Sequence, residues 1–193
     1  VLSGGSLAGN AQLQRTAEGG WRIQGDPTEA AFLVAERKLG VHERRKQRFE
    51  RIGEIPFTSE RKMMSTIVLD HEHGDERVLV AKGAPDVLLQ RCTRTRVGMD
   101  VVPLDDALRG RILADVDALS DAALRTLAVA YRPLHADEEI DPAQAADIER
   151  ELVFAGTVGI IDPPREEAAQ AIRQSAPPAR TPCTRRRGCA PPR

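Results

Sequence analysis

The sequence predicts a mixed α/β (α+β) domain in which a twisted, mainly antiparallel sheet is flanked by helices. Residues 65–69 and 77–81 are rich in β-branched side chains and are joined by a polar segment, as in a β-hairpin. Residues 152–161 are almost entirely apolar, which is typical of a strand buried on both faces. A capped helical segment begins at Asp26, and a charged helix is expected over residues 105–119.

The best-defined helix start follows a short strand that begins at Trp21. Asp26 can cap the helix, Pro27 suits its first position, and Glu29 lies three residues after the cap, as in a capping box. The helical pattern continues as far as Leu39, and Gly40 is a typical stop signal. Residues 42–48 are expected to be a charged surface stretch.

Strands and helices alternate through the rest of the chain. Residues 49–57 alternate well enough for a half-buried strand that ends at Pro56. The other expected elements are a short helix over 85–91, strands over 101–104 and 124–134, and a last helix over 165–175. The first twenty residues are expected to be a loose lead-in with one short helix. Residues 176–193 hold five Pro and five Arg without apolar periodicity, so we expect them to be disordered.

The composition argues against several classes of protein. The 193 residues include 28 Lys and Arg and 29 Asp and Glu, so no global positive field indicates binding to nucleic acid. No apolar run approaches the roughly 18 residues of a membrane helix, so we expect a cytoplasmic chain without direct membrane insertion. The three cysteines do not form a disulfide framework.

Several catalytic motifs are absent from the sequence. It contains no phosphate-binding P-loop, no dinucleotide-binding glycine pattern, no nucleophile elbow and no metalloprotease helix. His71 and His73 lie between acidic residues in a predicted hairpin loop, and no cysteine or third histidine is close by. We therefore expect a solvated loop and no metal site.

Four short segments carry side chains suited to ligand binding, namely residues 25–29, 56–65, 80–85 and 162–165. Phe57 stands beside basic residues, as an aromatic platform for a phosphorylated ligand would. Lys82 ends a strand, and Gly83 after it allows close approach to the backbone and to a helix start. Each segment also has an ordinary structural explanation, as a helix cap, a core aromatic, a surface lysine or a linker.

Taken in order, these segments resemble the nucleotide-binding (N) domain of P-type cation-transporting ATPases, and most closely its calcium-pump branch. The resemblance covers residues 20–175 and is carried by GDPTEAA, PFTSERKMMS, KGAPD, LRTLAVAYR and GIIDPPR. Each motif is weak alone, but five in the family's order make a chance match improbable.

The resemblance implies an ATP site with a base end and a phosphate end. At the base end, Phe57 would stack on adenine, and Leu127 would pack near it. Glu29 would accept a hydrogen bond from the adenine amino group or hold the polar network of the pocket. Stacking on one base contributes about 1–3 kcal/mol, so the expected affinity is weak, with a Kd of about 0.1 to a few mM.

At the other end, Lys62 and Lys82 would line the pocket, Gly83 would allow close approach, and Arg125 would reach a phosphate. Some relatives place an arginine two residues after the phenylalanine, where this sequence has Ser59. That contact would be absent or would be supplied by Arg61.

The resemblance also implies a division of the chain. Residues 1–161 would form the N domain, and residues 162–175 would begin the phosphorylation domain, with Asp162 and Arg165 at the hinge. Beyond residue 175 the family pattern stops, and a reading-frame change, or a truncation followed by foreign sequence, would explain the Pro- and Arg-rich tail. A genuine basic tail that contacts anionic partners is the alternative.

Three motifs of the family are not found in these residues: the DKTGT segment that holds the phosphorylated aspartate, and the TGD and GDGxND segments. We therefore expect ATP binding without turnover, with Mg²⁺ held by residues outside this chain. The expected partners are ATP and the remaining pump domains. The alternatives are a free-standing adenine-nucleotide-binding protein and a pump fragment without function.

Overall fold

The computed structural model describes residues 1–135, 138 and 145–161, and residues 1–161 form one compact unit. Two expected features, the helix over 165–175 and the tail over 176–193, lie outside the described residues. Within the described part, no helix is long and apolar enough to cross a membrane.

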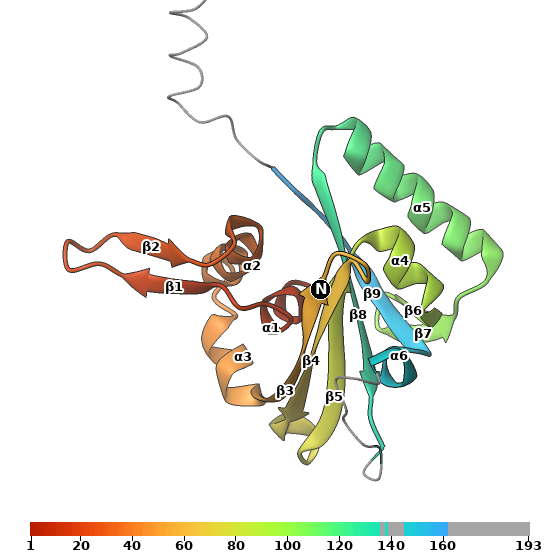
Figure 1. Ribbon diagram of the computed structural model, residues 1–193, viewed down its shortest axis with the longest axis horizontal. Coiled ribbons are helices and arrows are strands. Elements are labelled where there is room, and N and C mark those ends of the chain that lie inside the picture. The colour runs from red at the N-terminus through yellow and green to blue at the C-terminus, as the bar shows by residue number, and fades with distance from the viewer. Residues whose placement is uncertain (136–137, 139–144, 162–193) are drawn as a thin grey trace, which may run out of the picture. The chain divides into compact units, whose positions relative to one another are not determined.

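In the described part of the chain, the fold is built on a seven-stranded sheet (Figure 1). In spatial order its strands are β3 (Phe49–Thr58), β4 (Met63–Asp70), β5 (Glu76–Gly83), β8 (Arg125–Pro133), β9 (Leu152–Ile160), β6 (Cys92–Val97) and β7 (Asp100–Pro103). Only β6 and β9 pair in parallel, and the other neighbours are antiparallel. The predicted class, a mainly antiparallel sheet with flanking helices, is confirmed.

Helices accompany both faces of the sheet. They are α1 (Leu2–Leu7), α2 (Pro27–Lys38), α3 (His42–Arg48), α4 (Pro85–Gln90), α5 (Asp106–Asp121) and α6 (Ala145–Ile148), with a 3-10 turn η1 (His71–His73) between β4 and β5. In Figure 1, helices α1 and α2 lie to the left of the central strands, and helices α4 and α5 lie to their right. The side chains of Asp26 and Asp105 cap α2 and α5. The predicted helices over 27–39, 85–91 and 105–119 are therefore present.

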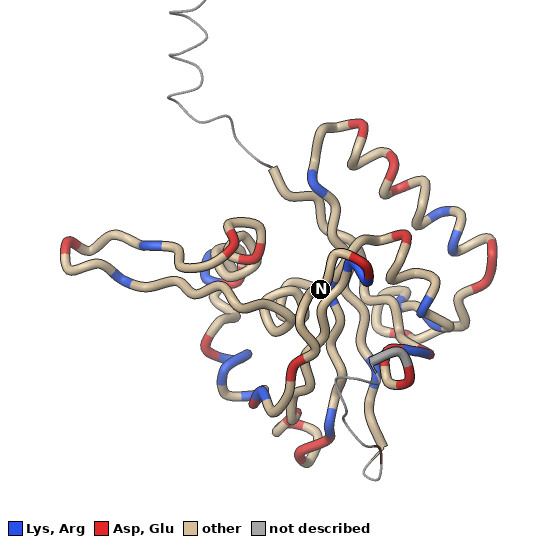
Figure 2. Tube along the Cα trace, viewed as in Figure 1, with Lys and Arg blue, Asp and Glu red and all other residues tan. Residues whose placement is uncertain are grey.

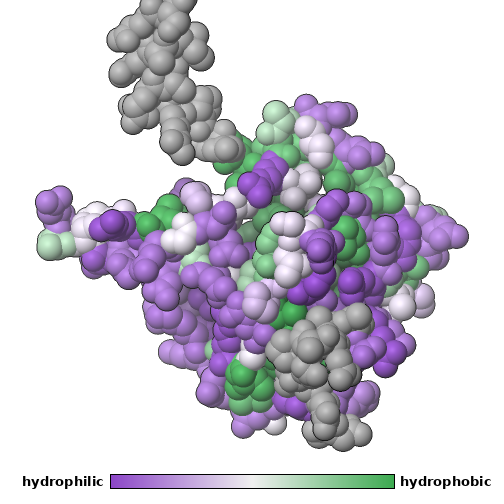
Figure 3. Space-filling model, in the orientation of Figure 1, coloured by the Kyte–Doolittle hydropathy of each residue, from purple (hydrophilic) through white to green (hydrophobic). Residues whose placement is uncertain are grey.

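Two apolar clusters lie on opposite faces of the sheet, because successive strand residues point to opposite sides. In β4, Met63 and Ile67 belong to the larger cluster with α4, whereas Met64 and Val68 belong to a smaller cluster with Leu7 of α1. All of these side chains are buried. The face seen in Figure 3 is mostly hydrophilic, with smaller apolar patches, and basic residues gather on α3 (Figure 2).

A two-stranded hairpin projects from this body (Figure 1). It consists of β1 (Gln12–Arg15) and β2 (Trp21–Gln24), which pair antiparallel. Trp21 is 54% exposed, and the Arg37 guanidinium lies 4.4 Å from its ring centroid. The strand at Trp21 and the short helix α1 are as expected, but β1 was not expected in the lead-in.

Three other expectations are corrected, and one further strand was not expected. Strand β3 continues through Pro56 to Thr58, because it is an edge strand whose register shifts between Ile55 and Thr58, where a missing N–H is tolerated. Residues 42–48 form helix α3 and bury His42, so they are more than a surface stretch. Strand β6 was not expected. Strand β9 is fully buried only over residues 152–154.

Candidate functional site

A cavity of about 290 Å³ lies at the open end of the β4–β5 hairpin, away from its connecting turn. Its lining residues are Asp26, Thr28, Glu29, Phe57, Lys62, Met64, Lys82, Gly83, Arg125 and Leu127. Every predicted site residue in the described part of the chain lies in this lining. Asp162 and Arg165, the two other predicted residues, lie outside the described residues.

Strand alternation explains why the cavity residues meet. Lys82 lies two residues beyond Val80 on β5, and Leu127 lies two residues before Val129 on β8. Val80 and Val129 belong to the smaller apolar cluster, so Lys82 and Leu127 continue the same face of the sheet. The pocket is therefore the open end of the face that α1 covers.

A buried ion pair forms one wall of the pocket. The Lys82 ammonium lies 3.0 Å from Glu29 Oε1, and only 6% of the lysine side chain and 19% of the glutamate side chain are exposed. Glu29 Oε2 also accepts hydrogen bonds from the backbone N–H groups of Asn10 (2.8 Å) and Ala11 (3.0 Å). Burial lowers the pKa of Lys82, and the Glu29 carboxylate opposes that shift. Glu29 is thus a fixed carboxylate with acceptor capacity left at Oε1.

The start of α2 places Glu29 in this wall. Asp26 Oδ1 accepts hydrogen bonds from the N–H groups of Thr28 (2.7 Å) and Glu29 (3.3 Å), which confirms the predicted cap. The predicted capping box is incomplete, because Glu29 does not return a hydrogen bond to the N–H of Asp26. Its carboxylate instead accepts from Lys82 and from the backbone N–H groups of residues 10 and 11. An ammonium and two N–H donors bind a carboxylate more strongly than a single N–H at the cap.

The turn between β3 and β4, residues 59–62, brings two more predicted residues to the pocket. Phe57 is 59% exposed, and its ring is therefore available to a ligand. Lys62 has a φ of 51°, and its N–H donates to Thr58 O (2.8 Å). Its carbonyl accepts from Ala84 N–H (3.0 Å), which ties the turn to the end of β5.

The packing of β4 against β5 also requires a glycine at position 83. A Cβ at this position would lie 2.6 Å from the carbonyl oxygen of Lys62 and 2.6 Å from Met63 Cβ. The absent side chain thus permits the close approach of β4, a role that requires no ligand.

Arg61 does not line the cavity. Its guanidinium is hydrogen-bonded to the buried carboxylate of Glu149, and Nη1 donates to Pro56 O at 2.9 Å. Of the two alternatives for the contact missing at Ser59, this arrangement favours its absence, because the Arg61 charge is engaged with Glu149.

Three lining residues were not predicted, namely Asp26 as a pocket residue, Thr28 and Met64. Met64 could have been found from strand alternation, because it shares the face of Lys82 across the hairpin, where the two residues are paired. Asp26 and Thr28 follow from their place at the first turn of α2 beside Glu29.

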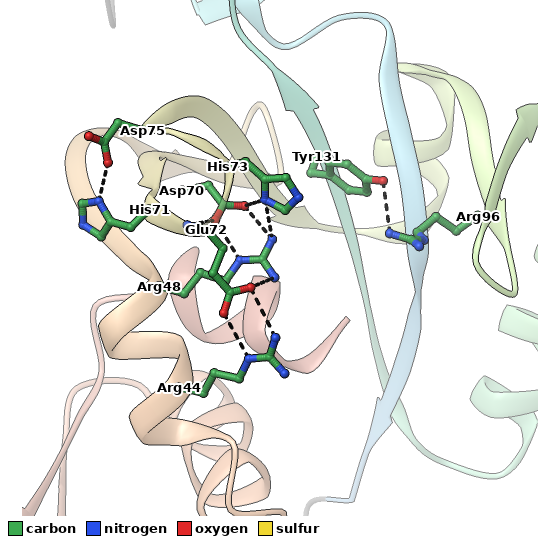
Figure 4. A network of polar contacts seen from close by, with 9 residues as sticks. All are labelled: Arg44, Arg48, Asp70, His71, Glu72, His73, Asp75, Arg96 and Tyr131. Carbon is green, nitrogen blue, oxygen red and sulfur yellow. Dashed lines mark hydrogen bonds and ion pairs between the residues drawn. The ribbon is translucent and has the colours of Figure 1, made fainter.

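The two histidines of the β4–β5 loop are paired with carboxylates (Figure 4). His71 Nδ1 lies 2.5 Å from Asp75 Oδ1, and His73 Nδ1 lies 2.9 Å from Asp70 Oδ2. Asp70 also accepts two hydrogen bonds from Arg48, at 2.8 and 2.6 Å. Among the described residues, no group of three or more metal-binding side chains is found.

Comparison with known proteins identifies the family. The family described as "P-type ATPase, cytoplasmic domain N" matches residues 1–167. The chain belongs to this family. As an N domain it carries the pocket described above at one end of its sheet.

This N domain is similar to segments of much longer proteins. It is 40% identical over 175 residues to the calcium-transporting ATPase of Bacillus subtilis, covering 90% of the chain and 19% of that protein. It is 38% identical over 152 residues to calcium-transporting ATPase 1 of Bacillus cereus, covering 78% and 16%. A magnesium-transporting P-type ATPase of Salmonella typhimurium is 37% identical over 130 residues, covering 65% and 13%. The chain thus spans less than a fifth of the length of these relatives.

Proposed function

We propose that this N domain binds ATP in the pocket at the end of the β4–β5 hairpin and serves as the nucleotide-binding domain of a calcium-transporting P-type pump. The observation that carries the proposal is the pocket lining, which combines an exposed phenylalanine, a fixed buried Glu–Lys pair and exposed basic residues. Calcium is favoured because the two calcium-transporting relatives match a larger share of the chain than the magnesium-transporting one.

Each part of ATP has a suitable group in the pocket. The exposed ring of Phe57 offers a face for adenine, and Leu127 adds apolar surface. The free acceptor capacity of Glu29 suits the adenine amino group. Lys62 and Arg125 are both exposed and suit the phosphates, since neither has an ion pair among the described residues.

The pocket is suited to weak, reversible binding. One stacked ring contributes about 1–3 kcal/mol, and exposed charge contacts add less than about 1 kcal/mol each. The Kd for ATP is therefore expected at about 0.1 to a few mM. The acceptor segment DKTGT is not present in these residues, so we expect this chain to bind ATP without hydrolysing it.

The test is an NMR titration of the chain with ATP, adenosine and inorganic triphosphate. Phe57→Ala should weaken ATP and adenosine by about five- to tenfold, because the stacking surface is lost. Lys62→Ala should weaken ATP and triphosphate by about two- to threefold and leave adenosine unchanged.

Two matched controls lie outside the pocket. Trp21→Ala removes an aromatic ring of similar exposure from the hairpin, and Lys46→Ala removes an exposed lysine from α3. Both should bind ATP like the wild type. The proposal fails if ATP does not bind, or if Phe57→Ala binds ATP as tightly as Trp21→Ala does.

A further inference from the structure

We infer that Arg61 and Glu149 are positioning residues for this pocket: their ion pair, on the far face of the sheet, holds the 59–62 turn and thereby sets the pose of Phe57 and Lys62. Neither residue lines the cavity, and 88 positions separate them in the sequence. The inference rests on the proposed ATP site, because it concerns how that site is held.

Glu149 is a buried charge with several partners. None of its side chain is exposed, and Oε1 accepts hydrogen bonds from Arg61 and from Ser65 Oγ, the latter at 2.6 Å. Oε2 has no hydrogen bond and lies 3.7 Å from Nη1 of Arg91. Because a buried carboxylate is costly without a paired cation, the Glu149 site holds the Arg61 guanidinium strongly in place.

The position of Glu149 is itself fixed by the larger apolar cluster. The residue before it, Ile148, is 4% exposed and belongs to that cluster, and its carbonyl accepts from Arg132 Nη2 at 2.9 Å. The carbonyl of Glu149 accepts from Arg91 Nη1 at 3.2 Å. The carboxylate of Glu149 is thus held in a fixed position, and it cannot move with the Arg61 side chain as a surface carboxylate could.

The two faces of β4 separate Glu149 from the pocket. Ser65, which bonds to Glu149, alternates with Met63 and Ile67 on the face of the larger cluster. Met64 points to the other face and lines the pocket. The turn between β3 and β4 therefore sends Arg61 to one side of the sheet, while Phe57 and Lys62 lie on the other.

Arg61 connects Glu149 to the turn at several points. Its Nη1 donates to the carbonyl of Pro56, the residue before Phe57, and its backbone N–H donates to Thr58 Oγ1 at 3.2 Å. Lys62 comes directly after it with a φ of 51°, a conformation that a lysine keeps only when its surroundings impose it. Arg61 therefore contacts the residues on either side of Phe57 and directly precedes Lys62.

The main test uses Glu149→Gln in the full chain. The amide keeps the shape and the contact to Ser65 but removes the charge that holds Arg61. We expect ATP to bind about three- to tenfold more weakly, and the effect to shrink to about two- to threefold in a Phe57→Ala background, because only the part that acts through Lys62 then remains. In the free protein, the amides of Lys62 and Ala84 should exchange faster with solvent.

The control is Asp70→Asn at the opposite end of β4. Asp70 is also buried and paired with an arginine, Arg48, so its loss tests whether destabilisation alone weakens binding. We expect Asp70→Asn to lower the melting temperature and to leave the Kd for ATP and both amide exchange rates unchanged. Arg61→Lys, which keeps the buried charge paired but loses the fork of hydrogen bonds, should act like Glu149→Gln and serves if that variant does not fold.

The inference is overturned if Glu149→Gln and Arg61→Lys lower the melting temperature but leave ATP affinity and amide exchange as in the wild type. The pair would then be structural only. A wild-type chain that does not bind ATP refutes the proposed function instead. In that case the amide exchange of the two variants still tests the positioning role. If the Lys62 and Ala84 amides exchange as in the wild type, Arg61 and Glu149 do not hold the turn; if they exchange faster, the pair does hold it.

Discussion

At the scale of single residues, the ion pair between Lys82 and Glu29 links stability to the candidate site. The ammonium is almost fully buried, and desolvation lowers the pKa of Lys82 while the carboxylate counteracts that shift. The phenyl ring of Phe32 lies 5.6 Å from the ammonium and adds a further favourable contact. The pair is therefore held by contacts within the protein and forms a fixed part of the pocket wall.

Removing one partner of this pair should lower the stability of the fold. Glu29→Gln leaves a buried ammonium without a counter-charge and should lower the free energy of unfolding by about 3 kcal/mol. The double variant Glu29→Gln/Lys82→Met removes the buried charge as well and should recover more than half of that loss. Urea unfolding followed by circular dichroism measures both. A single variant as stable as the wild type would show that the pair is not buried in solution.

At the scale of secondary-structure elements, two glycines differ in whether the surrounding structure has room for a side chain. Gly83 ends β5 where the backbone of Lys62 and Met63 leaves no room for a Cβ. Gly110 lies within the exposed helix α5, and nothing stands within 4 Å of a Cβ built there. One glycine is required by packing, whereas the other only weakens its helix.

The two alanine substitutions should therefore change stability in opposite directions. Gly83→Ala should lower the free energy of unfolding by about 1–3 kcal/mol, because β4 must move away. Gly110→Ala should raise it by about 0.5–1 kcal/mol, because alanine loses less entropy in a helix. Thermal unfolding of the two variants beside the wild type measures this. If Gly83→Ala proved neutral, the close approach of β4 and β5 would be disproved.

The elements that could be predicted from the sequence are those with a strong local signal. Runs of β-branched residues predict the β4–β5 hairpin, and Asp26 and Pro27 predict the start of α2. Strand β1 has a single apolar residue, Leu13, and β6 alternates threonine with arginine, so neither has a clear strand pattern. Both are strands because of partners: β1 pairs with β2, and β6 pairs with β9 almost sixty residues later.

At the scale of the whole molecule, the pocket residues could be predicted because they lie in short motifs that resemble a known family. Their convergence at one end of the sheet agrees with that prediction. The partners of Arg61 could not be predicted in this way. Glu149 lies far along the chain without a motif around it, and only the packing of the segment after α6 brings its carboxylate to Ser65 and Arg61.

The most direct test of the ATP site is a chemical-shift map of the isotope-labelled chain during an ATP titration to about 10 mM, well above the expected Kd. We predict saturable shifts in the amides of Glu29, Lys62, Lys82, Gly83 and Leu127, with little change around the loop of His71 and His73. The absence of saturable shifts would contradict the proposal. So would shifts centred on the separate cavity that Arg48, Arg96 and Tyr131 help to line, because ATP would then bind elsewhere.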